Sequence, residues 1–404
     1  MNAEMALHER PSGVASPVIE PARITVHASI SGLESRWRAF ESEADGYAYQ
    51  FYDWIATWHR HCGEVEKLAP RIVWIEDARG CPLMLLPLGI QKRRGGRALV
   101  WLGGAFADYL GPLLAPACSA WLTPARFADL WRAVELSLAP FDLLCLDRQP
   151  EWIGAQRNPF LDLPCIRNPS SAHATGLAAP YEGFVRAKRG ADWVRAERRK
   201  ERRLAEQGKI EFIVADHTNF SELVDALVRF KSLRYRELGV SDLFAERAHC
   251  EFLRAMSAAG IENGFVRLFA LKCTGRVIAV HWGLVARDRF YHMLPAYSRG
   301  AHRRYSPGGL LLRRMIEWAI AEGLRVFDFT IGDEPYKLEW CDREMRLYDC
   351  LHGRTPRGIL TVAVMRPART LKRAMKRNRL LFGFGKRLRA GLARRRRAVP
   401  DVDN

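Results

Sequence analysis

The sequence predicts an α/β (α+β) protein of two tandem units, each a mixed twisted sheet flanked by helices. The chain has 404 residues, of which 48% are hydrophobic, so it can bury a large core but exceeds one typical domain. One order of elements also occurs twice: two strands that form a hairpin, a third strand, a helix and a closing strand. These two observations predict diverged copies of one unit.

The first half contains one copy. Aromatic spacing over 51–58 predicts a helix, because it places the rings on one face. The apolar runs 71–77 and 82–91 flank a turn at Gly80 and predict the hairpin. The remaining expected elements are a strand and glycine-rich loop over 98–116, a helix over 124–138 and a strand over 141–149.

The second half repeats this order after a helix expected over 220–238. Its elements are strands over 265–273, 276–288 and 288–298, a helix over 306–323 and a strand over 325–332. Small polar residues over 167–179 predict a boundary between the halves. The expected division is a leader 1–21, a first unit 22–170, a second unit 171–365 and a tail 366–404.

Cysteine spacing and apolar run lengths indicate a cytoplasmic location. The nine cysteines form no C-x-x-C pair and no metal-like cluster, so we expect reduced thiols and no metal site. The first twenty residues lack a signal-peptide block, and the longest apolar run, 83–90, is too short for a membrane span.

Positive charge is concentrated in the tail. The net charge is +18, and 366–397 contributes fourteen Lys and Arg with no acidic residue, which leaves about +4 elsewhere. Leu371, Met375 and Phe382 are interspersed, which is typical of basic amphipathic helices on the inner face of an anionic membrane. RNA binding or a solvated tail would give the same pattern. A second basic stretch, 186–203, has the spacing of a solvated helix face or of a wall that attracts a phosphorylated ligand.

A helix start near residue 306 has the features of an anion site. The Ser306 hydroxyl is expected to cap the helix, and Gly308 and Gly309 leave its first amides bare for a pyrophosphate, with Arg299 as counter-charge. An ordinary capped helix explains the same residues. Pro295 interrupts the preceding strand and predicts that it parts from its neighbour, so strand and helix start are expected to form one slot.

These segments together resemble a known family. The stretch 270–337, with 82–91, 106–114 and 230–244, resembles the CelD/BcsL-type acyltransferases of the GNAT superfamily, which are associated with exopolysaccharide biosynthesis. The resemblance covers about 22–365. It implies a tandem GNAT fold similar to the FemAB aminoacyltransferases. It also implies transfer of an acyl group, acetyl in the simplest case, from an acyl-CoA donor to an amine or hydroxyl of an envelope or polysaccharide acceptor.

One departure leaves the donor open. The usual GNAT pyrophosphate loop carries Gln or Arg before Gly-x-Gly or Gly-x-Ala, whereas this chain has Ser306-Pro307-Gly308-Gly309. An aminoacyl-tRNA or a carrier-bound acyl group therefore stays possible as the donor. A degenerate GNAT pair that acts as a membrane-associated scaffold is the non-enzymatic alternative.

Acyl transfer requires a base, an oxyanion site and a proton donor. The expected catalytic residues are His281, His292, Asp333 and Tyr336, and Tyr336 would return a proton to the leaving group. The expected donor-binding residues are Pro295, Arg299, Ser306, Gly308, Gly309 and Lys337. The expected substrate-binding residues are Asp108, Tyr109, Asp328 and Glu334. The competing structural roles are a core position for His281, an arginine pair for Asp328, a loop cap for Asp108 and an ion pair between Glu334 and Lys337.

Overall fold

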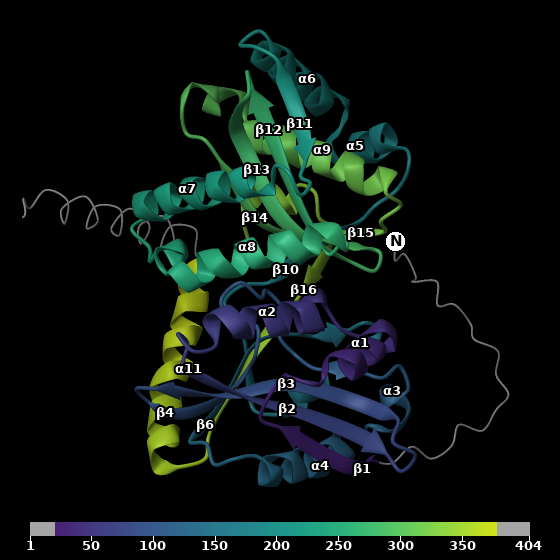
Figure 1. Ribbon diagram of the computed structural model, residues 1–404, viewed down its shortest axis with the longest axis vertical. Helices are drawn as coiled ribbons and strands as arrows, with labels where there is room; N and C mark the ends of the chain where they lie inside the picture. The colour runs from purple at the N-terminus through teal and green to yellow at the C-terminus, as the bar shows by residue number, and fades with distance from the viewer. Residues whose placement is uncertain (1–20, 378–404) are drawn as a thin grey trace, which may run out of the picture.

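The computed structural model describes residues 21–377, and the leader 1–20 and the tail beyond 377 lie outside the described residues. Two mixed sheets lie one above the other, each flanked by helices (Figure 1). None of the described helices combines the length and apolar composition needed to span a bilayer. The described residues also contain no group of three or more His, Cys, Asp or Glu placed to hold a metal ion.

The first sheet has the strand order β1-β2-β3-β4-β6-β17-β9. Its strands are β1 (Pro21–His27), β2 (Leu68–Asp77), β3 (Pro82–Arg93), β4 (Gly96–Trp101), β6 (Leu143–Pro150), β9 (Cys165–Arg167) and β17 (Leu347–Gly353), and β5 (Leu113–Leu114) pairs with β3. The helices of this half are α1 (Glu34–Glu43), α2 (Tyr52–Cys62), α3 (Cys118–Trp121) and α4 (Pro124–Ser137). Thr123 caps α4 by accepting from the Arg126 amide, and Pro124 follows at the first helical position.

The second sheet has the order β11-β12-β13-β14-β15-β10-β16. Its strands are β10 (Ala172–Gly176), β11 (Ile210–Val214), β12 (Val266–Cys273), β13 (Arg276–Ala286), β14 (Arg289–Tyr297), β15 (Val326–Ile331) and β16 (Arg343–Met345). Its helices are α5 (Tyr181–Arg189), α6 (Ala191–Ala205), α7 (Phe220–Leu238), α8 (Arg247–Glu262), α9 (Pro307–Ala321) and α10 (Pro335–Leu338). A short 3-10 turn, η4 (Ala301–Tyr305), precedes α9.

The predicted repetition is present. In each unit two helices lead into a hairpin, β2–β3 or β12–β13, and then a strand, a helix and a strand follow. The strand before the helix pairs in parallel with the strand after it, as β4 with β6 and β14 with β15. The structure is therefore a tandem of two mixed α/β units.

The division at residue 170 does not separate two contiguous units. β17 lies in the first sheet, antiparallel to β6, although the sequence placed it in the second unit. β10 takes the corresponding place in the second sheet, antiparallel to β15. The sequence placed β10 in the second unit, where it lies, but misplaced β17, because the partner of a short strand is set by tertiary contacts rather than by its own alternation.

Aromatic side chains join the two units into one continuous core. Trp54 of α2 lies with its ring centroid 5.1 Å from Phe252 of α8 and 6.3 Å from Trp282 of β13. Tyr49 contacts Tyr291 of β14 at 5.6 Å. All five rings are buried, so the interface resembles the interior of a single domain.

Two helix boundaries differ from those predicted. The basic stretch 186–203 is not one helix, because Gly190 adopts a φ of +79° and separates α5 from α6. The last helix, α11 (Pro356–Arg377), begins ten residues before the predicted start of the tail at 366, and it packs on β17, β6 and β9. Residues 366–377 are thus part of the folded structure.

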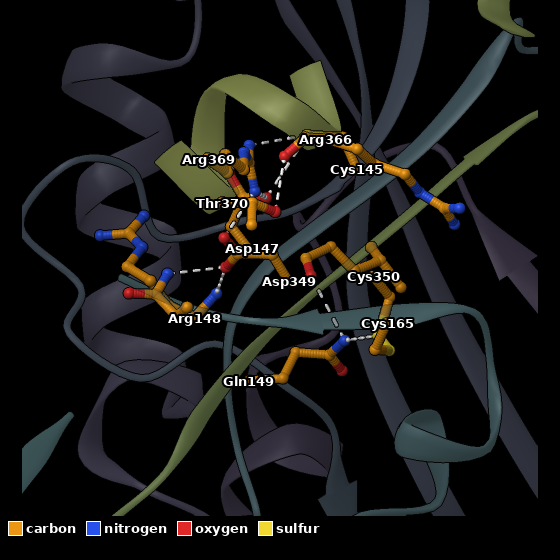
Figure 2. A network of polar contacts seen from close by, with 12 residues as sticks. Cys145, Asp147, Arg148, Gln149, Cys165, Asp349, Cys350, Arg366, Arg369 and Thr370 are labelled. Atoms are coloured by element: carbon orange, nitrogen blue, oxygen red, sulfur yellow. Dashed lines mark hydrogen bonds and ion pairs between the residues drawn. A yellow bond between two sulfur atoms is a disulfide. The ribbon is translucent and has the colours of Figure 1, made fainter. Parts of the chain in front are cut away.

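Two of the nine cysteines are paired, which contradicts the expectation of reduced thiols throughout. Cys165 of β9 and Cys350 of β17 are direct partners in the antiparallel register, and their sulfurs form a disulfide (Figure 2). Their separation of 185 residues gives no local signal, because the strand pairing alone brings them together.

Alkylation should show how many of the nine cysteines carry a free thiol. In denaturant without reductant, iodoacetamide is expected to modify seven of the nine cysteines, and all nine after reduction. Intact mass spectrometry reads the number directly. Nine modified cysteines without reductant would contradict the Cys165–Cys350 bond.

Candidate active site

β14 and β15 run side by side only at their beginnings. Their parallel pairing covers Arg289–Tyr291 against Val326–Asp328, and beyond Tyr291 the two strands part. The register between β13 and β14 shifts at Met293, which has no partner on β13 and lies two residues before Pro295. The backbone of β14 beyond Tyr291 therefore has no strand partner on its β15 side, as the proline predicted.

A cavity of about 970 Å³ lies at this opening. Its walls are the ends of β14 and β15, one face of α7, the turn into α10, and Asp108 from the first unit. The expected residues that line it are Asp108, His292, Pro295, Arg299, Asp333, Glu334, Tyr336 and Lys337. The size and the convergence of several titratable groups are typical of a small-molecule site.

Asp108 is a cavity carboxylate whose pKa is raised toward neutrality. It follows β4 in the glycine-rich loop and is half-buried. Burial raises its pKa to about 6, opposed by a hydrogen bond with Thr330 and by the charges of Lys337 and Arg148. The Tyr49 hydroxyl lies 3.4 Å from its Oδ2. The sequence identified Asp108 as a substrate contact but not as a titrating group near neutral pH.

Lys231 is a cavity residue that the sequence analysis missed. It projects from α7, and burial lowers its pKa to about 8, while the carboxylates of Asp108 and Glu334 act in the opposite direction. Its position continues the buried stripe of Leu223 and Leu227 at intervals of four residues. A lysine in an apolar stripe was the signal that could have found it.

The two histidines lie in contact, but only one reaches the cavity. The rings of His281 and His292 are 4.1 Å apart, and His292 alone lines the cavity. Burial lowers the pKa of His292 to about 3 and that of His281 well below its usual range. Neither ring nitrogen of His281, nor Nδ1 of His292, has a hydrogen-bond partner among the described residues. Both imidazoles are therefore neutral at pH 7.

Asp328 and Tyr109 lie behind the cavity rather than in its wall. The Tyr109 hydroxyl donates to Asp328 Oδ1 at 2.6 Å, and Arg289 Nη1 donates to Oδ2 at 2.7 Å. Asp328 is fully buried and also accepts from the Thr330 amide at 2.8 Å. Its predicted alternative role, pairing with an arginine, is present. The expectation that Tyr109 and Asp328 contact substrate finds no support, since their polar atoms are bonded to each other.

Thr330 occupies a strained conformation at the end of β15. Its φ of +60° is rare for a β-branched residue, and a bulge in the pairing with β10 lies beside it. The bond from its amide to Asp328 maintains this geometry, and its hydroxyl lies 3.2 Å from the His292 carbonyl oxygen. Strain of this kind concentrates at functional sites.

The turn into α10 brings four predicted residues to the cavity mouth. Lys337 is buried, donates to the Ile331 carbonyl at 2.8 Å and pairs with Glu334 at 3.1 Å. The ion pair that competed with a binding role is thus present. Asp333 accepts from the Ser171 amide at 3.2 Å, and burial followed by the Glu334 charge raises the pKa of Tyr336.

The start of α9 lies beside the cavity but not in its wall. The prediction that the Ser306 hydroxyl caps the helix is wrong: Ser306 is left-handed with a φ of +54°, and its carbonyl accepts from the amides of Gly309 and Leu310. Two first-turn amides are therefore occupied. A Cβ added at Gly308 would lie 3.1 Å from Tyr297, which does line the cavity. Arg299 lines it too and pairs with Glu237.

A comparison with known families matches this region. A family model described as an acetyltransferase (GNAT) domain matches residues 194–338, which run from α6 to α10. The matched segment contains the parted strands and every cavity residue named above except Asp108. A search of curated protein sequences found no match.

Solved structures are similar over most of the chain at low sequence identity. A structure titled FemX is 10% identical with a TM-score of 0.54, and the match covers 80% of this chain and 97% of that one. The C-terminal domain of a putative lysylphosphatidylglycerol synthetase from Agrobacterium fabrum is 13% identical with a TM-score of 0.51, covering 83% and 97%. A conserved protein of unknown function from Bacteroides thetaiotaomicron is 10% identical with a TM-score of 0.51, and the match covers 82% of this chain and 100% of that one.

At these identities the structural likeness shows the fold alone. The family match and the repeated topology nevertheless agree on the kind of unit that occurs twice here. The finer assignment to the CelD/BcsL type is not among the matches. The chain has a tandem GNAT-type fold whose second unit is similar to the GNAT acetyltransferase domain.

Proposed function

We propose that the protein is an N- or O-acyltransferase that moves an acyl group from an acyl-CoA-type donor to an amine or hydroxyl. One observation supports this most strongly: the opening between β14 and β15 leads into a cavity whose wall also includes Asp108 of the other unit. A donor at the parted strands and an acceptor at Asp108 would meet between the two units. The resemblance to exopolysaccharide-associated proteins suggests an envelope or polysaccharide acceptor.

Asp108 is the proposed general base. A base works best when its pKa lies near the operating pH, and Asp108 at about 6 meets this condition. His292, at about 3, is a much weaker base, and His281 does not reach the cavity. Asp108 would take the proton from the acceptor as its nitrogen or oxygen attacks the acyl carbon.

The parted strand is the proposed oxyanion site. The amides of Met293 and Leu294 lie where β14 has lost its partner on the β15 side, whereas Pro295 has none to donate. An amide directed at the carbonyl oxygen stabilises the negative charge that develops there as the acceptor attacks, and this charge is lost when the carbon–sulfur bond breaks. The leaving thiolate then requires a proton. Lys231, with a pKa of about 8, matches a thiol better than Tyr336, whose pKa is raised. Asp108 can return its proton to Lys231, which closes the cycle.

The donor's phosphate groups are proposed to lie near Arg299, Lys337 and the start of α9. Gly308 approaches Tyr297 so closely that a larger residue would have to displace this ring, which lines the cavity. This geometry, rather than a row of free amides, links the helix start to the donor site.

Donor binding should depend on Gly308. Acetyl-CoA is expected to raise the melting temperature of the full chain, because a ligand of the folded state stabilises it, and Gly308→Val should lose most of this shift. Gly183→Val is the matched control, since Gly183 lies in the first turn of α5 with no atom closer than 3.8 Å to an added Cβ. Equal shifts in both variants would remove the helix start from the donor site. No shift with acyl-CoA or aminoacyl-tRNA would favour the non-catalytic scaffold.

Aminoacyl transfer from tRNA is the second candidate. Arg198, Arg199, Arg202 and Arg203 of α6 have no acidic partner among the described residues, and α6 packs against η4, which adds Arg303. Such unpaired cations suit a phosphate backbone. RNA binding that weakens steeply with salt, with no response to acetyl-CoA, would favour this candidate over acyl-CoA.

A further inference from the structure

The outward face of α11 is apolar along its length. Ile359, Leu360, Val364 and Leu371 expose 58%, 69%, 65% and 62% of their surface. Ala363, Pro367 and Ala368 fill the positions between them, at the three- and four-residue spacing of one helix face. Four of the twelve large hydrophobic side chains exposed on the described part of the chain lie on this one helix. We call these seven residues the α11 stripe.

The opposite face of α11 is fixed to the first sheet by polar contacts. Arg369 donates to Asp147 Oδ1 at 2.6 Å and pairs with Asp349 at 2.8 Å, and Arg366 donates to the Leu351 carbonyl at 2.6 Å (Figure 2). At the other end, a Cβ on Gly358 would overlap the Asp142 carbonyl oxygen at 1.8 Å, so only glycine permits this approach. The helix cannot turn over to bury its stripe without breaking these contacts.

Unpaired cations lie at both ends of the stripe. At its beginning, Thr361 Oγ1 donates to the Gly95 carbonyl, which places the β3–β4 turn with its exposed Lys92 and Arg94 beside α11. At its end, Lys372 is exposed. None of these three side chains has an acidic partner among the described residues. From Arg357 to Arg397 the sequence has no Asp or Glu.

We infer that the α11 stripe docks on an anionic lipid surface, with α11 lying parallel to it. Its 22 residues give about 33 Å of helix, enough for several side chains to enter the headgroup boundary together. Apolar residues in the middle with cations at both ends fit the interfacial region of an anionic bilayer. A protein partner would need an apolar groove with an acidic rim that matches the stripe. An anionic lipid surface supplies negative charge in its headgroups and an apolar region in its acyl chains. This inference does not rest on the proposed acyl transfer.

Vesicle flotation of the full chain tests the stripe. The protein is expected to float with vesicles of phosphatidylcholine mixed with phosphatidylglycerol, and less with phosphatidylcholine alone or at high salt. Leu360→Gln combined with Val364→Gln should lower the vesicle partition coefficient roughly tenfold. Both positions are exposed, so the fold should tolerate the change. Val214→Gln on β11 is the matched control, since Val214 is 39% exposed and lies in the second sheet, whereas α11 packs on the first.

Three results would overturn the inference. Unchanged partition of the double variant would show that the stripe does not contact lipid, and that any binding comes from other residues. Equal binding to neutral and anionic vesicles would remove the role of charge. A parent dimer that the double variant converts to a monomer, measured by light scattering, would assign the stripe to a second copy of the chain.

Discussion

Arg289→Met is expected to destabilise the protein by about 3–5 kcal/mol. Arg289 neutralises Asp328, whose side chain is 1% exposed, and methionine would leave that carboxylate buried without a counter-charge. Methionine also has a long unbranched side chain, so most of the loss in the free energy of unfolding should come from the lost charge rather than from lost volume. The urea midpoint should fall accordingly, measured by tryptophan fluorescence with the slope of the transition as a check on the denatured state.

A surface pair provides the control for this change. Arg132 and Asp129 are 3.1 Å apart on α4, with their side chains 72% and 76% exposed. Arg132→Met should alter the free energy of unfolding by no more than about 0.5 kcal/mol, because water screens the pair. If both variants lowered the free energy of unfolding by the same amount, the pair of Arg289 and Asp328 would not stabilise the junction between β14 and β15.

Asp108→Asn is expected to lower kcat/KM by about 100-fold or more, because asparagine cannot accept the acceptor's proton. In the parent protein, kcat/KM should rise with pH through about 6, the pKa that burial gives Asp108. The variant should lose this rise. Asp129→Asn, on the exposed face of α4, should leave both the rate and the profile unchanged. A loss of less than tenfold would contradict Asp108 as the base.

The same variant should be more stable than the parent above pH 6. The folded-state pKa of Asp108 is raised above its unfolded value of 3.8, so the folded protein binds this proton more tightly between those values. The free energy of unfolding therefore falls as pH rises from about 4 to 6. Above pH 6 it stays at this lower value, because the folded protein then holds the carboxylate in its charged form. The difference between the folded and unfolded pKa values of Asp108 corresponds to about 3 kcal/mol at most. Equal melting temperatures of parent and variant at pH 7.5 would contradict the raised pKa.

The sequence predicted elements well where a periodic pattern extended over many residues. The helix expected over 220–238 is α7, Phe220–Leu238, because its apolar stripe is long and a glycine in the left-handed conformation ends it. The hairpins at Gly80 and Gly275 were equally clear. The sheet that β17 joins was not predicted, because nothing within this short strand specifies its partner.

The site was predicted in part, for a similar reason. Pro295 predicted the parted strand, because proline has no amide hydrogen to donate to a neighbouring strand and this can be read from the sequence alone. The raised pKa of Asp108 and the lowered pKa of Lys231 arise from burial at a cavity that residues from both units line, which no local pattern reveals. The capping role given to Ser306 was wrong because its left-handed backbone directs the carbonyl, not the hydroxyl, at the helix amides.

The return of β17 to the first sheet has a consequence for synthesis. The first sheet lacks an interior strand until residue 353 has been made, because β17 lies between β6 and β9. The amino-terminal half therefore cannot finish folding on the ribosome before the whole second sheet has emerged. The amino-terminal half should not be obtainable as an independent fragment cut near residue 170, because without β17 it would expose an unpaired edge of β6 that its own sequence cannot fill.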